Sequence, residues 1–354
     1  MRHILLVLGL IVFVSPRVAA EDGVAMRYTA IADPGKGWVY GLDISGSGDR
    51  VLFVKCDRHD WWSFIPVRLQ RLLDDFSRCN NKTLVVVDET GKSIATMSFG
   101  GDYHDAHFVD RDTIAFSGEN CCHIMVAMVS PDGVIRISGK RDIPQSFLHS
   151  NLRLSATWLG GQIYTAIEHP AGHLTVESMS GDDRHILDGL DVRKINDIGL
   201  AHDIIWFRAA IEHDVLGAYR GPAKIIADYP FPGGGGPGVD EVLGFAAFGP
   251  DADAISAQIM RNFTDIDGAL PWMQLKRGYS KYAIRDVSPG GTVLTTMGEK
   301  HFYIFKREGA SYRRLVVDRP SDLFAAAVSN NGRVVALEPD MDGRKIIKLG
   351  IPAD

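Results

Sequence analysis

The feature that most constrains the fold is a repeated pair of short apolar segments separated by a polar turn rich in Gly, Asp, Ser or Asn. Residues 284–296 (IRDVSPGGTVLTT) show the pattern clearly. Copies occur at residues 41–54, 106–117, 153–166, 196–209, 244–258, 284–296 and 324–337, mostly about 40 to 50 residues apart. Two more strand-like segments follow most copies. Short strands at this period predict an all-β fold, a seven-bladed β-propeller of four-stranded antiparallel blades.

The two ends of the chain predict how this ring closes. The last copy is followed by only one more strand-like segment, residues 344–350, so the last blade lacks a fourth strand. A spare strand-like segment, residues 25–32, precedes the first copy. Because an unpaired sheet edge invites association with other chains, we expect residues 25–32 to pair with residues 344–350 and close the ring.

The turns of the repeats carry a family resemblance. Residues 287–291 (VSPGG) and 328–332 (VSNNG) resemble the Ser-Pro-Asp-Gly turns of the WD40-like repeats in TolB-type periplasmic β-propellers. The resemblance covers the repeats generally. It implies a propeller fold and a tendency to bind partners. Because no catalytic set of residues in the sequence is complete, we expect a non-catalytic binding or scaffold module for an envelope protein or ligand.

The first 20 residues have the layout of a secretory signal peptide. Arg2 precedes an apolar run over residues 4–14, and small residues end at Ala20, where we expect cleavage. The run is shorter than the roughly 20 residues that a membrane span needs. We therefore expect an exported protein, periplasmic or secreted, with no membrane span and a single propeller domain over residues 21–354.

The charge of that domain excludes one class of partner. Without residues 1–20 the chain holds 36 basic and 44 acidic side chains, a net charge of −8 with no basic stripe. Such a surface repels phosphate backbones, so no nucleic acid partner is expected.

An insertion at residues 57–82 interrupts the first blade. Its apolar residues recur at helical spacing, at positions 65, 69, 72, 73 and 76. The helix is either a lid packed on its own propeller or a docking element for a partner. In the second case Trp61, Trp62 and Phe64 are the docking candidates, and a protein or small ligand binds the face that bears the insertion.

Four cysteines are expected on that same face. Cys56 and Cys79 bracket the insertion, and Cys121 and Cys122 lie on the corresponding turn of the next blade. Four cysteines allow three pairings: Cys56–Cys79 with a vicinal Cys121–Cys122 ring, or two pairings that join the blades. In an exported chain we expect all four to form disulfides.

Polar residues on innermost strands predict a binding site at the mouth of the central channel. The segment YHDAH places His104, Asp105 and His107 at the start of one such strand, and other blades contribute Asp43, Asp197 and Asp286. Propeller lactonases and related hydrolases hold a divalent cation in this region. The main expectation is a site without a cofactor or catalytic residues. The alternative is a metal-dependent hydrolase or lyase, similar to the lactonases, with a divalent cation such as calcium.

Overall fold

A computed structural model describes most of the strands and their turns. The described residues are 24–35, 38–56, 82–99, 106–118, 123–142, 154–159, 162–168, 174–180, 184–187, 192–201, 204–212, 223–230, 239–247, 251, 253–255, 257–258, 283–297, 301–320, 325–339 and 345–353.

The described strands form six four-stranded sheets, which are the blades of the ring. The first blade holds β2 (Trp38–Ile44), β3 (Arg50–Cys56), β4 (Lys82–Asp88) and β5 (Ser93–Phe99). The second holds β6 (Ala106–Phe108), β7 (Thr113–Gly118), β8 (His123–Val129) and β9 (Ile135–Asp142). The third holds β10 (Leu154–Leu159), β11 (Gln162–Glu168), β12 (Leu174–Ser178) and β13 (Arg184–Leu187).

The other three blades complete the ring. The fourth holds β14 (Val192–Ala201), β15 (Ile204–Glu212), β16 (Ala223–Pro230) and β17 (Val239–Ala247). The fifth holds β18 (Ala283–Val287), β19 (Val293–Met297), β20 (His301–Glu308) and β21 (Ser311–Asp318). The sixth holds β22 (Ala325–Val328), β23 (Val334–Pro339), β24 (Lys345–Pro352) and, from the other end of the chain, β1 (Met26–Gly35).

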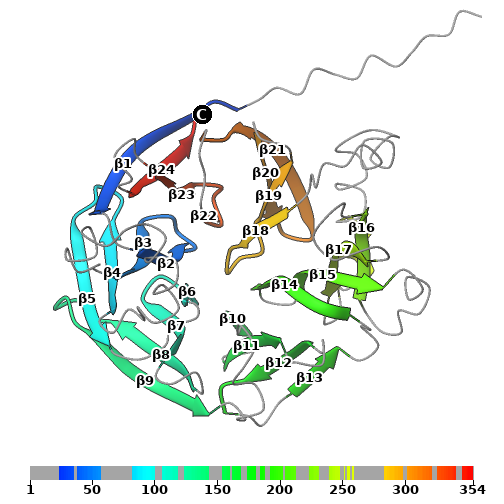
Figure 1. Ribbon diagram of the computed structural model, residues 1–354, viewed down its shortest axis with the longest axis horizontal. Helices are drawn as coiled ribbons and strands as arrows, with labels where there is room; N and C mark the ends of the chain where they lie inside the picture. Colours follow the sequence, from blue (N-terminus) through cyan, green and yellow to red (C-terminus); the bar gives the residue numbers. More distant parts are fainter. Residues whose placement is uncertain are drawn as a thin grey trace, which may run out of the picture.

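The six sheets stand around a common centre (Figure 1). The first strand of each of the first five sheets, together with β22, lies innermost. Each innermost strand contacts the next, in the order β2, β6, β10, β14, β18, β22 and back to β2. This closed circuit of antiparallel sheets is a β-propeller.

The predicted count of seven blades is wrong, because the copy at residues 244–258 is not a hairpin. Its first segment is the end of β17, which pairs with both β15 and β16 inside the fourth blade. In its second segment Asp253, Ala254 and Ile255 are helical, and the Ile255 N–H donates to the Asp251 carbonyl at 3.0 Å. Ala has a high helix propensity and Asp favours turns and helix starts, which explains the local preference for a helix.

The two ends of the chain meet in the sixth blade. β1 pairs antiparallel with β24 in a register that runs from Met26 opposite Pro352 to Gly35 opposite Lys345. The predicted pairing of residues 25–32 with 344–350 is therefore present, and β1 is the outermost strand of this sheet. The amide of Val24 also donates to the Val316 carbonyl of the fifth blade at 2.8 Å.

The core is divided into layers between neighbouring blades. Alternate residues of β3 face opposite sides, as the period of two in a strand requires. Leu52 and Val54 pack against the second blade, whereas Val51 and Phe53 pack against the sixth. The first blade is therefore buried on both faces, and the apolar runs of its strands reflect this.

The turns between first and second strands form a hydrogen-bonded belt around part of the ring, which we call the turn belt (residues 45–50, 109–113, 288–292 and 329–333). The backbone N–H of Asn330 donates to the Gly46 carbonyl at 2.9 Å, and the side-chain oxygen of Asn330 accepts the Gly290 N–H at 2.7 Å. Arg111 donates to Asp49 at 2.8 Å. These contacts join the fifth, sixth, first and second blades.

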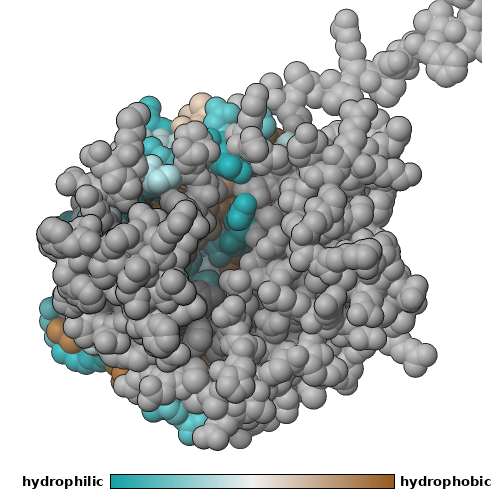
Figure 2. All heavy atoms as spheres, in the orientation of Figure 1, coloured by the Kyte–Doolittle hydropathy of each residue, from teal (hydrophilic) through white to brown (hydrophobic). Residues whose placement is uncertain are grey.

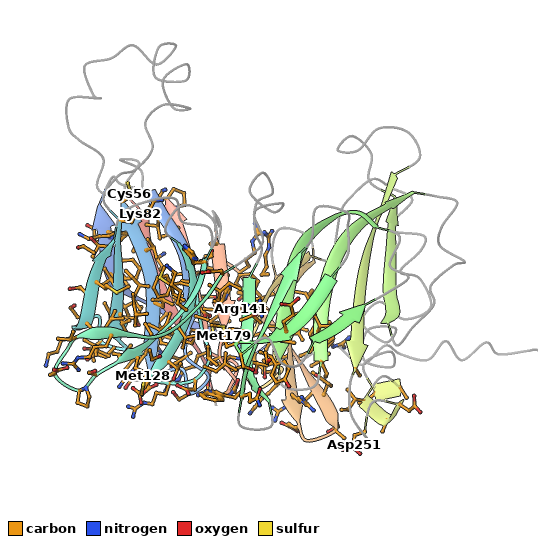
Figure 3. All side chains as sticks on the ribbon, turned by 90° about the horizontal axis from the view of Figure 1, so that it is seen from below. Cys56, Lys82, Met128, Arg141, Met179 and Asp251 are labelled. Atoms are coloured by element: carbon orange, nitrogen blue, oxygen red, sulfur yellow. The ribbon has the colours of Figure 1, made fainter. Side chains whose placement is uncertain are left out.

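The two ends of the first blade carry different features. Cys56 pairs with Trp38 at the start of β2, at the end opposite the turn belt. Cys56 and Lys82 lie together at this end, and Met128 lies toward the other end of the molecule (Figure 3). The predicted insertion covers residues 57–82, but Lys82 is the first residue of β4, and residues 57–81 lie outside the described residues.

Candidate functional site at the centre of the ring

Three of the side chains predicted for the central site lie together. One possible ligand atom from each of Asp43, His107 and Asp286 falls within 4.8 Å of the others. The three residues come from β2, β6 and β18, so they belong to the first, second and fifth blades. Residues from widely separated parts of the sequence therefore form one cluster, which we call the central cluster. Viewed as in Figure 1, the molecule has hydrophilic atoms around a hollow near the middle of the ring (Figure 2).

The repeat explains why these three residues meet. Each is the penultimate residue of its innermost strand, so one residue separates it from the turn that follows. The equivalent residue of the sixth blade, which stands between the fifth and first blades, is Ala327. Ala327 is buried and has no polar side-chain atom, so the sixth blade adds no ligand atom at this position.

Both carboxyl groups hold the next blade through the same hydrogen bond. Asp43 Oδ2 accepts the backbone N–H of Phe108 at 2.6 Å, and Asp286 Oδ2 accepts that of Val328 at 2.7 Å. Phe108 and Val328 are the last residues of the neighbouring innermost strands. Asp43 Oδ1 also accepts the N–H of Ile44 at 2.7 Å. These bonds fix the position of both carboxyl groups.

The imidazole of His107 faces Asp43 at a distance longer than a hydrogen bond between these two side chains. His107 Nδ1 lies 3.7 Å from Asp43 Oδ2, beyond the usual range for an N–H···O bond. The Asp43 side chain is 5 % exposed and that of His107 is 21 % exposed. His107 is therefore the more exposed side chain of the two.

The electrostatics of the cluster are unfavourable to two negative charges. Burial, together with the nearby carboxylate of Asp43, raises the pKa of Asp286 from about 3.8 to about 8. His107 and the backbone N–H groups of Val328 and Val287 lower this pKa, but to a smaller extent. As a whole residue Asp286 is half-buried. At neutral pH Asp286 therefore favours its protonated form.

The central cluster lies at the turn-belt end of the first blade, away from the end that bears the predicted insertion. Asp43 pairs with Leu52 near the turn belt, whereas Cys56 is at the opposite end of β3. The central cluster and the predicted partner face are therefore at opposite ends of the first blade.

The remaining predicted site residues divide into two groups. Asp197 lies on β14 opposite Arg208, four residues before the end of the strand, so it does not share the penultimate position. Outside the described residues lie His104, Asp105, Trp61, Trp62, Phe64, Cys79, Cys121 and Cys122.

Cys56 is the cysteine that the structure describes. It is buried at the end of β3, and its sulfur is in a disulfide. The pairing pattern among the four cysteines stays a prediction, since the other three lie outside the described residues.

The sequence reasoning missed the groups that orient the cluster. The N–H groups of Phe108 and Val328 leave no signal in residue type, because every residue except proline has such a donor. Ala327 had a detectable signal, since aligning the four turns places it in register with Asp43, His107 and Asp286.

The sheets and the central cluster define the chain as a β-propeller with a polar centre. No protein-family model and no curated protein sequence matches it. Among the described residues no helix is both long and apolar enough to cross a membrane.

Solved structures of WD40 propellers resemble the chain at the level of fold. The WD40 repeats of RRP9 match with a TM-score of 0.45 and 9% identity, covering 94% of this chain and 99% of that one. U3-55K matches with a TM-score of 0.42 and 10% identity, over 88% and 80%. The Cps50 (Swd1) propeller domain of Myceliophteria thermophila matches with a TM-score of 0.35 and 11% identity, over 89% and 84%. The assignment of the fold rests on the sheets themselves, and such distant similarity carries no information on function.

Proposed function

We propose that this chain is an exported, non-catalytic β-propeller that binds an envelope protein or a ligand. The supporting observation is the bonding of Asp43 and Asp286, which both accept a backbone N–H from the next blade. These hydrogen bonds hold both carboxyl groups in fixed positions between neighbouring blades. A rigid polar centre suits binding, because little ordering is needed when the ligand arrives.

The proposal of export is tested by the mass of the protein in its native host. Cleavage after Ala20 gives a mature chain that begins at Glu21. We expect this mass in the periplasmic or secreted fraction. Recovery of a chain that still contains residues 1–20 from the cytoplasm contradicts it.

The proposal of a protein partner is tested by site-specific photo-crosslinking in native envelope material. A photoreactive phenylalanine analogue replaces Trp61 or Trp62 in turn, and a control replaces Ile137, which is 54% exposed on β9. We expect one discrete adduct from the tryptophan positions and none from Ile137. Adducts from the control alone, or none from any position, contradict a partner on the insertion face.

A second candidate function is metal-dependent hydrolysis, and the central cluster favours it. Two carboxyl groups and an imidazole within 4.8 Å are a possible ligand set for a divalent cation. The test is hydrolysis of a panel of lactones by metal-loaded protein. Turnover that is lost in Asp286→Asn and after chelation supports an enzyme, and bound metal without turnover supports the binding role.

A further inference from the structure

We propose that Asp43, His107 and Asp286 bind a divalent first-row transition-metal ion, Mn²⁺ or Zn²⁺, which links the first, second and fifth blades at the centre of the ring. The inference concerns the site named for the second candidate function, but it does not require turnover. Its test is a binding and stability measurement, so its failure is distinguishable from the failure of either proposed function.

The spacing of the side chains matches a metal site better than a hydrogen-bonded one. The 3.7 Å between His107 Nδ1 and Asp43 Oδ2 is too long for a strong hydrogen bond. Two ligand atoms that each lie about 2.0 to 2.2 Å from one tetrahedral ion are separated by about 3.4 Å. A ligand atom of Asp286 lies within 4.8 Å of the other two, so it must move toward them to complete three-fold coordination.

The carboxyl groups retain capacity to coordinate an ion. An ionised carboxylate has about four lone-pair positions. Asp43 uses one for the N–H of Ile44 and one for that of Phe108. Asp286 uses its lone pairs for the N–H groups of Val287 and Val328. The hydrogen bonds fix each carboxyl group as outer-shell partners fix metal ligands, and lone pairs remain for the ion.

The charge balance also favours a cation. Asp43 is 4% exposed, and a carboxylate oxygen of Asp286 lies within 4.8 Å of one of its own. A divalent ion neutralises two carboxylates held this close and removes their repulsion.

The ligand types select the metal. Imidazole suits Zn²⁺ and other transition metals, and carboxylate suits Mn²⁺, so the mixed set favours this class. Calcium takes six to eight oxygen ligands, and the described cluster supplies one nitrogen and two carboxyl groups. Three protein ligands leave at least one position of the ion open to water or to a ligand.

The test uses the full chain, treated with a chelator under non-reducing conditions so that disulfides stay intact. Mn²⁺, Zn²⁺ and Ca²⁺ are titrated separately by calorimetry, and metal content is measured after dialysis. We expect one equivalent of Mn²⁺ or Zn²⁺ per chain and a higher thermal midpoint with either. We expect Ca²⁺ to bind at least tenfold more weakly.

Two variants locate the ion. His107→Ala removes the imidazole, and Asp286→Asn removes a charge while its side-chain oxygen still accepts the Val328 N–H. We expect each to weaken Mn²⁺ or Zn²⁺ binding at least tenfold. His301→Ala is the matched control, because His301 also faces an aspartate (Asp318, at 3.5 Å) but lies on β20 away from the centre. It should bind as the unaltered chain does.

Spectroscopy gives a readout that a purely structural effect does not move. Co²⁺ in the site should show visible absorption bands that shift in His107→Ala, since a nitrogen ligand is lost. Circular dichroism without metal checks that the variants fold, and if Asp286→Asn does not fold, His107→Ala decides alone. The proposal is overturned if the unaltered chain holds no stoichiometric ion. It is also overturned if Ca²⁺ binds equally well, or if a folded His107→Ala binds and absorbs like the control.

Discussion

At the scale of single residues, Gly91 shows how one turn depends on a distant strand. Gly91 has φ of +87°, and a Cβ there would lie 1.9 Å from the carbonyl oxygen of Ile31 on β1. Gly309 also has a positive φ, of +65°, but no atom would lie within 4 Å of its Cβ. Gly309→Ala should therefore cost about 1 kcal/mol of unfolding free energy through backbone strain alone. Gly91→Ala should cost at least about 1 kcal/mol more, because β1 must move. Urea denaturation of both variants measures the difference. Equal losses would mean that β1 does not pack on this turn.

The same scale shows what the sequence could predict of the central cluster. Asp43, His107 and Asp286 were predictable together because the repeat fixes which position of each innermost strand faces the centre. Asp197 was predicted on the same basis, but a strand of ten residues with irregular pairing does not hold the register of its shorter counterparts. The position of the cluster along the axis of the ring was not predictable, since it depends on where each turn begins and not on residue type.

At the scale of elements, the pattern of hairpins predicted the strands better than the blades. Five of the seven copies supply the first two strands of the first five blades. A sixth copy, at residues 324–337, supplies β22 and β23 of the sixth blade. The prediction from the copy at residues 244–258 was wrong because its first half resembles an innermost strand. In the structure this half is the end of β17, which lies in the interior of the fourth sheet. The order β14-β15-β17-β16 reverses the last two strands. A sheet order is set by long-range pairing, and no local pattern in the chain records it.

Neighbouring blades are also joined by side chains between outer strands, and Arg141 tests how much one such contact contributes. Arg141 on β9 lies 3.0 Å from the Glu177 carboxylate on β12 and donates to the Ser178 carbonyl at 2.9 Å. Both side chains of the ion pair are largely buried, at 12% and 19% exposure. Arg141→Ala should lower the unfolding free energy by about 2 to 3 kcal/mol, because it leaves Glu177 buried without this partner.

Arg136 on the same strand is the matched control for Arg141. Its ion pair with Asp132 is exposed on both sides, at 57% and 54%, and lies within one blade. Arg136→Ala should cost less than about 1 kcal/mol. Chemical denaturation of the two variants side by side measures both values. A loss at Arg136 as large as that at Arg141 would show that burial between blades is not what gives the contact its strength.

At the scale of the whole molecule, the ring depends on pairing between the two ends of the chain. β1 covers the edge of β24, Ile31 packs in the core between the first and sixth blades, and Val24 reaches the fifth blade. One segment therefore contacts three consecutive blades. This arrangement was predictable from the missing fourth strand, because a propeller whose last blade is one strand short leaves an open edge.

Removal of β1 tests this closure directly. A chain that begins at residue 36 loses the strand, exposes the edge of β24 and uncovers the core around Ile31. A chain that begins at Val24 keeps every contact described for the segment and is the matched control. We expect the shorter chain to melt at least about 5 °C lower than the control. We also expect it to associate as its concentration rises, because the open edge can pair with a second copy. Differential scanning calorimetry and light scattering over a concentration series measure the two effects. Equal melting temperatures with both chains monomeric would show that the sixth blade is stable with three strands. The pairing of β1 with β24 would then not be needed to close the ring.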